Sequence, residues 1–171
     1  MSEGFHPKPR MSFPSALGLG IAGRQEVMEV DFEQETPVPE LLAALAAHAP
    51  LGLEFHSAEV VAPGSRKAQA RSFTYEVDPP AARRDELPAA IERLLSATSL
   101  PVHRPGKSAP IDVRPLIEDL CVEQGRLRMR LLATHEAGAR PRDVLGALLD
   151  WRDDLDACVW ALERTEVELQ P

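Results

Sequence analysis

The chain has 171 residues, of which 44% are hydrophobic and 27% are charged, so it carries enough apolar material for a folded core of one or two small domains. Its formal net charge of −8 argues against general adhesion to DNA or to a membrane surface, and we expect neither as a partner. No apolar run approaches the roughly 20 residues of a membrane-spanning helix, and the N-terminus lacks the apolar stretch of a signal peptide. We therefore expect a cytoplasmic protein.

The charges are spread unevenly along the chain. Eight acidic residues and no Lys or Arg lie between Glu26 and Pro63, whereas nine basic and six acidic residues lie between Gly64 and Arg114. Such polarity can orient a partner even when the net charge is unfavourable. Two differently solvated faces would produce the same pattern.

The first elements that the sequence predicts are strands. A strand is expected at residues 11–17, and the glycine-rich residues 18–23 superficially match a dinucleotide-binding fingerprint. That motif requires a helix to follow, whereas residues 28–33 alternate between apolar and acidic side chains, as a strand with one solvent-exposed face does. We therefore interpret the glycines as a hairpin or bulge between two strands.

A helix and another strand complete the first half. Pro39 suits the first turn of a helix that carries its leucines on one side and ends at Pro50. Residues 51–61 are expected to form a strand, and the polar, basic segment 64–70 is the natural linker to the second half.

The second half predicts the element order β-α-β-β-α-β. Asp85 is a plausible N-cap for its first helix, and Pro141 opens its second. Gly125 marks a turn between two strands. The expected strands lie at residues 72–77, at Val102 and 111–122 with a break at Pro115, at 127–131 and at 158–169. This is the order of a ferredoxin-like split βαβ unit.

These elements predict an α+β fold made of two tandem ferredoxin-like (split βαβ) halves, residues 1–64 and residues 65–171. The first half contains only strand, strand, helix and strand, as if its opening strand and helix were missing. We therefore expect it to be truncated at its N-terminus. A single larger α+β sheet is the alternative.

The best candidate for a functional surface is the segment GFHPKPR at residues 4–10. Its two prolines fix φ and hold their neighbours extended, so the side chains of His6, Lys8 and Arg10 point to one side. This pre-ordered cationic row suits phosphate or carboxylate recognition, because little chain entropy remains to be lost on binding. A stiff connection with merely solvated charges is the alternative.

Asp112 and Arg114 are the second pair of candidate binding residues. They alternate along an extended segment and so share a face. They could form a polar contact between the two halves or part of a binding cleft with the Lys8 row, but we favour a structural salt bridge.

A row of three arginines, Arg126, Arg128 and Arg130, has the spacing of a nucleic-acid-binding strand. The closing strand offers Glu166 and Glu168 on its own polar face. If the two strands are neighbours, pairing across them would occupy most of the row, and we favour that interpretation.

The N-terminal segment SEGFHPKPRMSF at residues 2–13 resembles the radical-SAM-linked domain of unknown function, a bacterial family. The resemblance resumes at Lys107 and in the sequence IDVRP at residues 111–115. It continues through Arg140-Pro141 and Arg164-Thr165, so it spans almost the whole chain. Family members usually carry a strand and a helix before the N-terminal motif, and this sequence begins within the motif.

The resemblance implies a non-catalytic accessory or substrate-recognition domain that works with a radical SAM protein. RNA or a ribosomal component is the substrate we expect for the pair. The chain is not itself a radical SAM enzyme, because Cys121 and Cys158 cannot supply the three closely spaced cysteines of the iron–sulfur centre. The histidines show no zinc-ligand spacing either, so we expect no metal and no cofactor.

Two other functions stay open on the sequence. One is a cofactor-independent enzyme that uses His6 as acid/base while Lys8 and Arg10 hold an anion, although no carboxylate beside His6 orients it. The other is a purely structural protein-interaction module.

Overall fold

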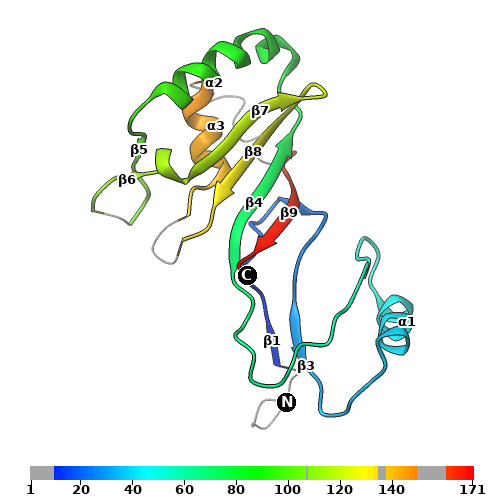
Figure 1. Cartoon of the computed structure of the whole chain (residues 1–171). Coiled ribbons are helices and arrows are strands. Elements are labelled where there is room, and N and C mark those ends of the chain that lie inside the picture. The colour runs from blue at the N-terminus through cyan, green and yellow to red at the C-terminus, as the bar shows by residue number, and fades with distance from the viewer. Residues whose placement is uncertain (1–9, 107, 135–137, 150–160) are drawn as a thin grey trace. The chain divides into compact units, whose positions relative to one another are not determined.

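The computed structural model describes residues 10–106, 108–134, 138–149 and 161–171 (Figure 1). It is a mixed α+β structure, as the sequence predicts. The chain divides into two compact units: the described part of the first is residues 10–13 and 28–67, and the second contains residues 14–27 and the described residues from 68 onward. No helix in the described ranges has the length and hydropathy that a bilayer span requires.

The first unit contains two short strands and one helix among its described residues. Strand β1 (Arg10–Ser12) pairs antiparallel with β3 (Glu29–Asp31), and the Ser12 hydroxyl donates a 3.0 Å hydrogen bond to Glu29. Helix α1 (Val38–His48) follows, with a proline in its first turn as predicted.

The strand expected at residues 51–61 is wrong, because the structure forms no strand there. Gly52 takes a positive φ of 87°, and the Leu53 amide donates back to the Pro50 carbonyl, so the segment begins with a turn. An extended apolar segment becomes a strand only where a neighbour accepts its backbone hydrogen bonds, and the β1–β3 pair does not extend to it.

The second unit is built on a five-stranded sheet in the order β2-β9-β4-β8-β7. Strand β2 (Ala22–Gly23) is parallel to β9 (Glu163–Leu169), and the remaining neighbours β4 (Ala70–Val77), β8 (Arg126–Leu132) and β7 (Ile117–Glu123) are antiparallel. A separate short pair joins β5 (Pro101–Val102) to β6 (Ile111–Asp112). Residues 14–27 thus contribute a strand to this unit although they precede the expected linker.

Two α-helices complete the second unit as it is described. Along the chain, helix α2 (Leu87–Ser96) comes after β4 and before β7, and helix α3 (Pro141–Leu149) comes after β8 and before β9. The chain order β4-α2-β7-β8-α3-β9 is the element order predicted for the second half. The finer assignment to two tandem ferredoxin-like halves is not shown, because the described residues of the first unit form only β1, β3 and α1.

Smaller elements refine the boundaries. The 3-10 helix η1 (Ala81–Glu86) precedes α2, so Glu86 rather than Asp85 is the N-cap residue, and no side chain caps the helix. The break at Pro115 is the 3-10 turn η2 (Arg114–Leu116). The expected turn at Gly125 is confirmed: Gln124 and Gly125 have φ values of 52° and 82°, which is typical of a two-residue type I′ hairpin.

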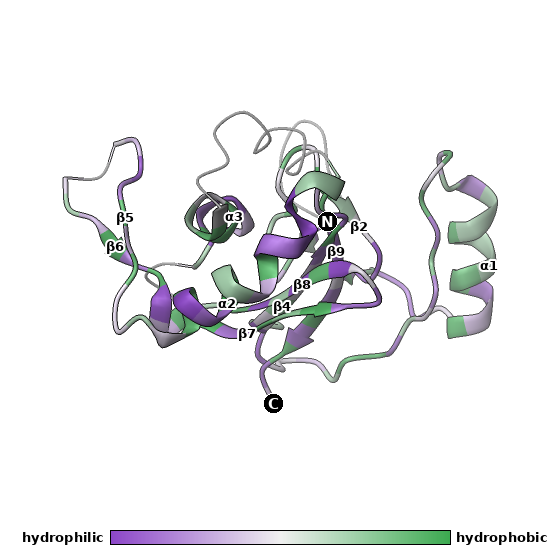
Figure 2. Cartoon of the chain, turned by 90° about the horizontal axis from the view of Figure 1, so that it is seen from above, coloured by the Kyte–Doolittle hydropathy of each residue, from purple (hydrophilic) through white to green (hydrophobic). Residues whose placement is uncertain are grey.

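The core of the second unit lies between α2, α3 and one face of the sheet (Figure 2). Strand β8 shows the cause, since Leu127, Met129 and Leu131 are fully buried while the alternate arginines face the other way. Helix residues Leu87 and Leu145 are equally buried in the same cluster. Alternation along β8 therefore gives the sheet one apolar face and one charged face.

Hydrogen bonds from Arg164 on β9 connect the segment 14–27 to the sheet of this unit. Arg164 is only 1% exposed, and its guanidinium makes two hydrogen bonds to the Glu26 carboxylate, one of them 2.7 Å long from Nε. The same guanidinium lies 4.9 Å above the centroid of the Phe73 ring and donates to the Ser15 and Ala16 carbonyls. Burying this charge requires Glu26, so the ion pair fixes where the segment lies.

We expect Glu26→Gln to lower the free energy of unfolding by roughly 2 to 4 kcal/mol, because it leaves the buried guanidinium of Arg164 without its counter-charge. Urea denaturation measures the loss, and Glu92→Gln on the exposed side of α2 is the matched control. The double variant Glu26→Gln/Arg164→Met should recover part of the stability, since it removes both charges. A loss no larger than that of the control would contradict this role.

Candidate functional site

The N-terminal row is only partly within the described structure. His6 and Lys8 lie outside the described residues. Arg10 is exposed at the start of β1, where its Cα pairs with that of Asp31 across the two strands. Opposite charges at paired positions favour this register.

Asp112 and Arg114 both bond to the backbone around the β5–β6 pair. The Asp112 carboxylate accepts from the amides of Leu100 at 2.7 Å and Arg114 at 3.1 Å, and the first of these bonds is the main reason that its pKa is lowered. The Arg114 guanidinium donates to the carbonyls of Leu95 at 2.8 Å and Ile117 at 3.3 Å, which joins the end of α2 to the start of β7.

These bonds give Asp112 and Arg114 a structural part in the second unit. The favoured side-chain salt bridge between them is not what the structure has, since each side chain bonds to backbone groups instead. Arg10 belongs to the first unit, so the cleft suggested between the N-terminal row and this pair stays a prediction.

The arginine row of β8 pairs with carboxylates on strands β4, β7 and β9 of the same sheet. Arg126 contacts Glu76 at 2.7 Å and Glu163 at 2.8 Å. Arg130 contacts Glu168 at 2.5 Å, as favoured from the sequence, although β4 lies between β8 and β9 and the long side chains reach across it. The row is therefore balanced by acidic residues of the same sheet face.

Four charged side chains on this face form a closed ring of ion pairs across four adjacent strands. Arg71 on β4 contacts Glu118 on β7 at 2.7 Å and Glu168 on β9 at 2.5 Å. Arg130 on β8 contacts the same two carboxylates at 2.8 and 2.5 Å. We call Arg71, Glu118, Arg130 and Glu168 the charged ring. Each guanidinium bridges both carboxylates, so no member has a single partner.

Two hydroxyl groups of the central strand lie beneath these long side chains. Ser72 is 1% exposed; its Oγ donates to Glu168 at 2.6 Å and accepts from Arg130 Nε at 3.2 Å. Thr74 is 2% exposed and donates to Glu166 at 3.1 Å. The small polar residues of β4 are thus buried and satisfied under a layer of paired charges.

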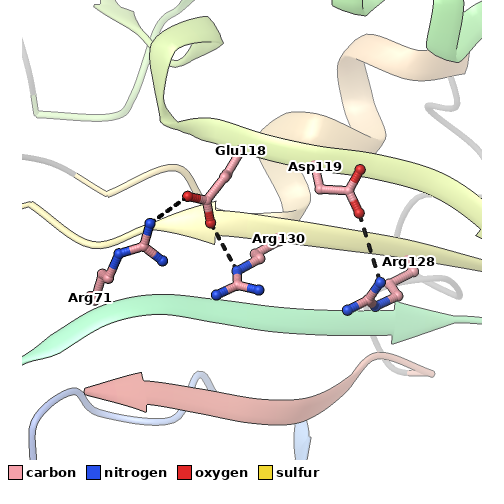
Figure 3. A pocket seen from close by; sticks show the side chains of 5 residues that line it. All are labelled: Arg71, Glu118, Asp119, Arg128 and Arg130. Carbon is pink, nitrogen blue, oxygen red and sulfur yellow. Dashed lines mark hydrogen bonds and ion pairs between the residues drawn. The ribbon is translucent and has the colours of Figure 1, made fainter. Parts of the chain in front are cut away.

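Part of the ring opens into a hollow on this face (Figure 3). Its volume is about 430 Å³, and it is lined by Arg71, Glu118, Asp119, Arg128 and Arg130. The register of β7 against β8 shifts between Ile117 and Asp119, which makes Glu118 the extra residue of a β-bulge. Because a bulge redirects its side chain, Glu118 reaches both Arg71 and Arg130.

Three of the four charges in the ring, those of Arg71, Arg130 and Glu168, are fixed at neutral pH. Hydrogen bonds from Ser72, Arg71 and Arg130 lower the pKa of Glu168 to about 2. The bond to Glu168 is also the main cause that raises the pKa of Arg71 and that of Arg130. Groups whose pKa values move away from neutrality hold their charge and do not exchange protons near pH 7, so this arrangement favours ionic binding over acid/base chemistry.

A second hollow, of about 330 Å³, lies where β4, β8 and β9 reach the same end of the sheet and is lined in part by Phe73, Thr134 and Gln170. It brings together no pair of charged side chains. Within the described ranges, no three His, Cys, Asp or Glu side chains are placed to hold a metal ion.

The sequence interpretation included Arg130 and Glu168 but missed Arg71 and Glu118. Arg71 could have been suspected as a charged residue beside a strand that carries a polar face. Glu118 could not, because it enters the ring only through a bulge, and a bulge leaves no clear mark in the amino-acid pattern.

We expect Glu168→Gln to flatten the acid side of the stability curve. The folded pKa of Glu168 is depressed from its ordinary value of 4.5 to about 2, so its contribution is present above pH 4.5 and is lost as the pH falls toward 2. The free energy of unfolding should therefore drop less steeply between pH 5 and pH 2.5 in the variant than in the parent protein. Denaturation at several pH values checks this, and a slope equal to that of Glu92→Gln would contradict it.

Comparison of the amino-acid sequence with known proteins identifies a family. No curated protein and no solved structure matches the chain. Residues 1–141 match the model of the family described as "Uncharacterized protein conserved in bacteria (DUF2344)", and this range includes β1 to β8 and all ring residues except Glu168. The chain belongs to this bacterial family.

Proposed function

We propose that this protein is a non-catalytic accessory or substrate-recognition domain that works with a radical SAM protein. The partner is suggested by the resemblance carried by residues 2–13 and 111–115. Under the same proposal, the second unit is a ferredoxin-like half and the first unit is its tandem counterpart. The strand order β9-β4-β8-β7 and the chain order of the second unit support the first part of that assignment.

One observation supports recognition over catalysis: mutual hydrogen bonds shift the pKa values of Arg71, Arg130 and Glu168 in the charged ring away from neutrality. Arg71 and Arg130 stay cationic and Glu168 stays anionic across the neutral range. Guanidinium groups that are planar and permanently charged recognise carboxylates and phosphates, whereas an acid/base catalyst needs a pKa near the working pH. The alternative that uses His6 as acid/base gains no support from the described residues.

The proposed substrate of the pair is RNA or a ribosomal component, contacted through the N-terminal row of His6, Lys8 and Arg10. The arginine row of β8 is a poor RNA surface, because each of its guanidiniums is already paired with carboxylates. An RNA backbone would have to displace those partners.

The proposed partner is tested by co-expressing this protein with the radical SAM protein whose gene lies nearest to its own. We expect the two proteins to co-purify through size exclusion in 150 mM salt. The RNA part is tested by filter binding to ribosomal RNA fragments between 50 and 200 mM salt. Lys8→Ala/Arg10→Ala should weaken binding by about ten-fold or more and make it less salt-dependent, because two phosphate contacts are lost.

The matched control is Arg66→Ala/Lys67→Ala, which removes the same charge from an exposed segment. If both double variants weaken binding equally, the effect is one of net charge and the N-terminal row is not the site. If the protein binds neither RNA nor the radical SAM protein, the proposed function is wrong.

A further inference from the structure

We propose that the hollow beside the charged ring binds a phosphate monoester group, and that Glu118 is a built-in competitor occupying its place. This inference rests on the proposed function in one respect, that the sheet face serves recognition. It adds the ligand class and the residues that select it.

The position of Glu118 defines the binding geometry. One of its carboxylate oxygens lies 2.7 Å from Nη2 of Arg71, and the other lies 2.8 Å from Nε of Arg130. The two guanidiniums, from strands β4 and β8, therefore converge on one anion-sized place (Figure 3). The Arg71 side chain is 42% exposed and that of Glu118 is 31% exposed, so solvent and small ligands reach this place.

The two guanidiniums are held in position from the opposite side. Glu168 contacts Nη1 of Arg71 and Nη2 of Arg130 at 2.5 Å each, whereas the buried Ser72 hydroxyl accepts from Nε of Arg130, the nitrogen that also lies 2.8 Å from Glu118. These bonds persist when Glu118 moves away, so little side-chain freedom is lost when a ligand enters. Glu118 itself belongs to β7, an edge strand of the described sheet, where its side chain can turn outward without disturbing the inner strands.

Arg128 supplies a third cationic group. Its ion pairs with Asp119 and Glu123 have N–O distances of 3.8 and 3.7 Å, which are longer than hydrogen bonds. Its N–H groups can therefore turn to a ligand in the same hollow at small cost. Arg71, Arg128 and Arg130 then surround the anion with three guanidiniums from two neighbouring strands.

The ligand must compete with a carboxylate that is already in place. A phosphate monoester carries a charge of about −1.5 to −2 at pH 7 and three strong acceptor oxygens, so it exceeds Glu118 in both charge and hydrogen bonds. A phosphodiester carries one charge and two free oxygens, which is no better than the carboxylate it would replace. The hollow therefore selects a terminal phosphate over a nucleic-acid backbone.

Titration of the full chain with inorganic phosphate, followed by the side-chain Nε–H signals of its arginines in NMR spectra, tests this proposal. We expect saturable shifts at Arg71, Arg128 and Arg130 at constant ionic strength. Arg128→Gln should weaken binding by about ten-fold, since a charge-assisted hydrogen bond is lost. Glu118→Gln should tighten binding several-fold, because it removes the competing charge and keeps the shape.

The control is Glu76→Gln, which removes a carboxylate from the same sheet face whose partner, Arg126, does not line the hollow. It should leave phosphate affinity within two-fold. Circular dichroism melting verifies that each variant is folded. Equal tightening by Glu76→Gln and Glu118→Gln would overturn the competitor role, because it would show only a general effect of charge.

A ligand series decides the chemical class. Inorganic phosphate and phenyl phosphate should bind more tightly than dimethyl phosphate or acetate. Equal binding of dimethyl phosphate, or shifts spread evenly over all arginines, would overturn the proposal. The outcome is separable from the proposed function: capture of the radical SAM protein without phosphate binding removes only this inference, and phosphate binding without capture or RNA binding removes only the proposed partner role.

Discussion

The charged ring is the interaction on which the polar face of the second unit depends. Strand β8 turns three apolar residues toward the helices, and its alternation places three arginines on the opposite face. Those charges are neutralised by carboxylates from β4, β7 and β9. The charged ring links four adjacent strands through its ion pairs. The sheet is thus joined by backbone hydrogen bonds within it and by paired charges above it.

An arginine–carboxylate pair also determines how the segment 14–27 packs in the second unit. Arg164 is buried and needs Glu26, so an early segment of the chain lies against the last strand of the sheet. In both places an arginine contacts partners that are far away in sequence. The difference is the exposure of the arginine: Arg164 is buried and serves the fold, whereas the arginines of the ring border an open hollow and remain accessible to a ligand.

Several elements could be predicted from the sequence because their signals are local. Alternation gave β3, β4 and β8, prolines marked the starts of α1 and α3, and Gly125 marked the β7–β8 turn. The strand predicted at residues 51–61 is not formed, because strand pairing depends on a neighbouring strand, which the local sequence does not reveal. The sequence predicts that carboxylates of the closing strand balance the β8 arginines, but on the premise that the two strands are neighbours, whereas β4 lies between them. The bulge that brings in Glu118 and the burial of Arg164 depend on tertiary contacts and could not be predicted.

The charged ring holds the guanidiniums of Arg71 and Arg130 in fixed orientations beside an accessible hollow. The most direct measurement is the exchange of the Nη protons of Arg71 and Arg130 in side-chain NMR spectra of the ligand-free chain, compared with exposed Arg66 and Arg93. Two carboxylates bridged by each guanidinium should slow rotation about the Nε–Cζ bond, so that separate Nη signals are seen for Arg71 and Arg130 but not for the exposed pair. Averaged signals at all four arginines would contradict the account.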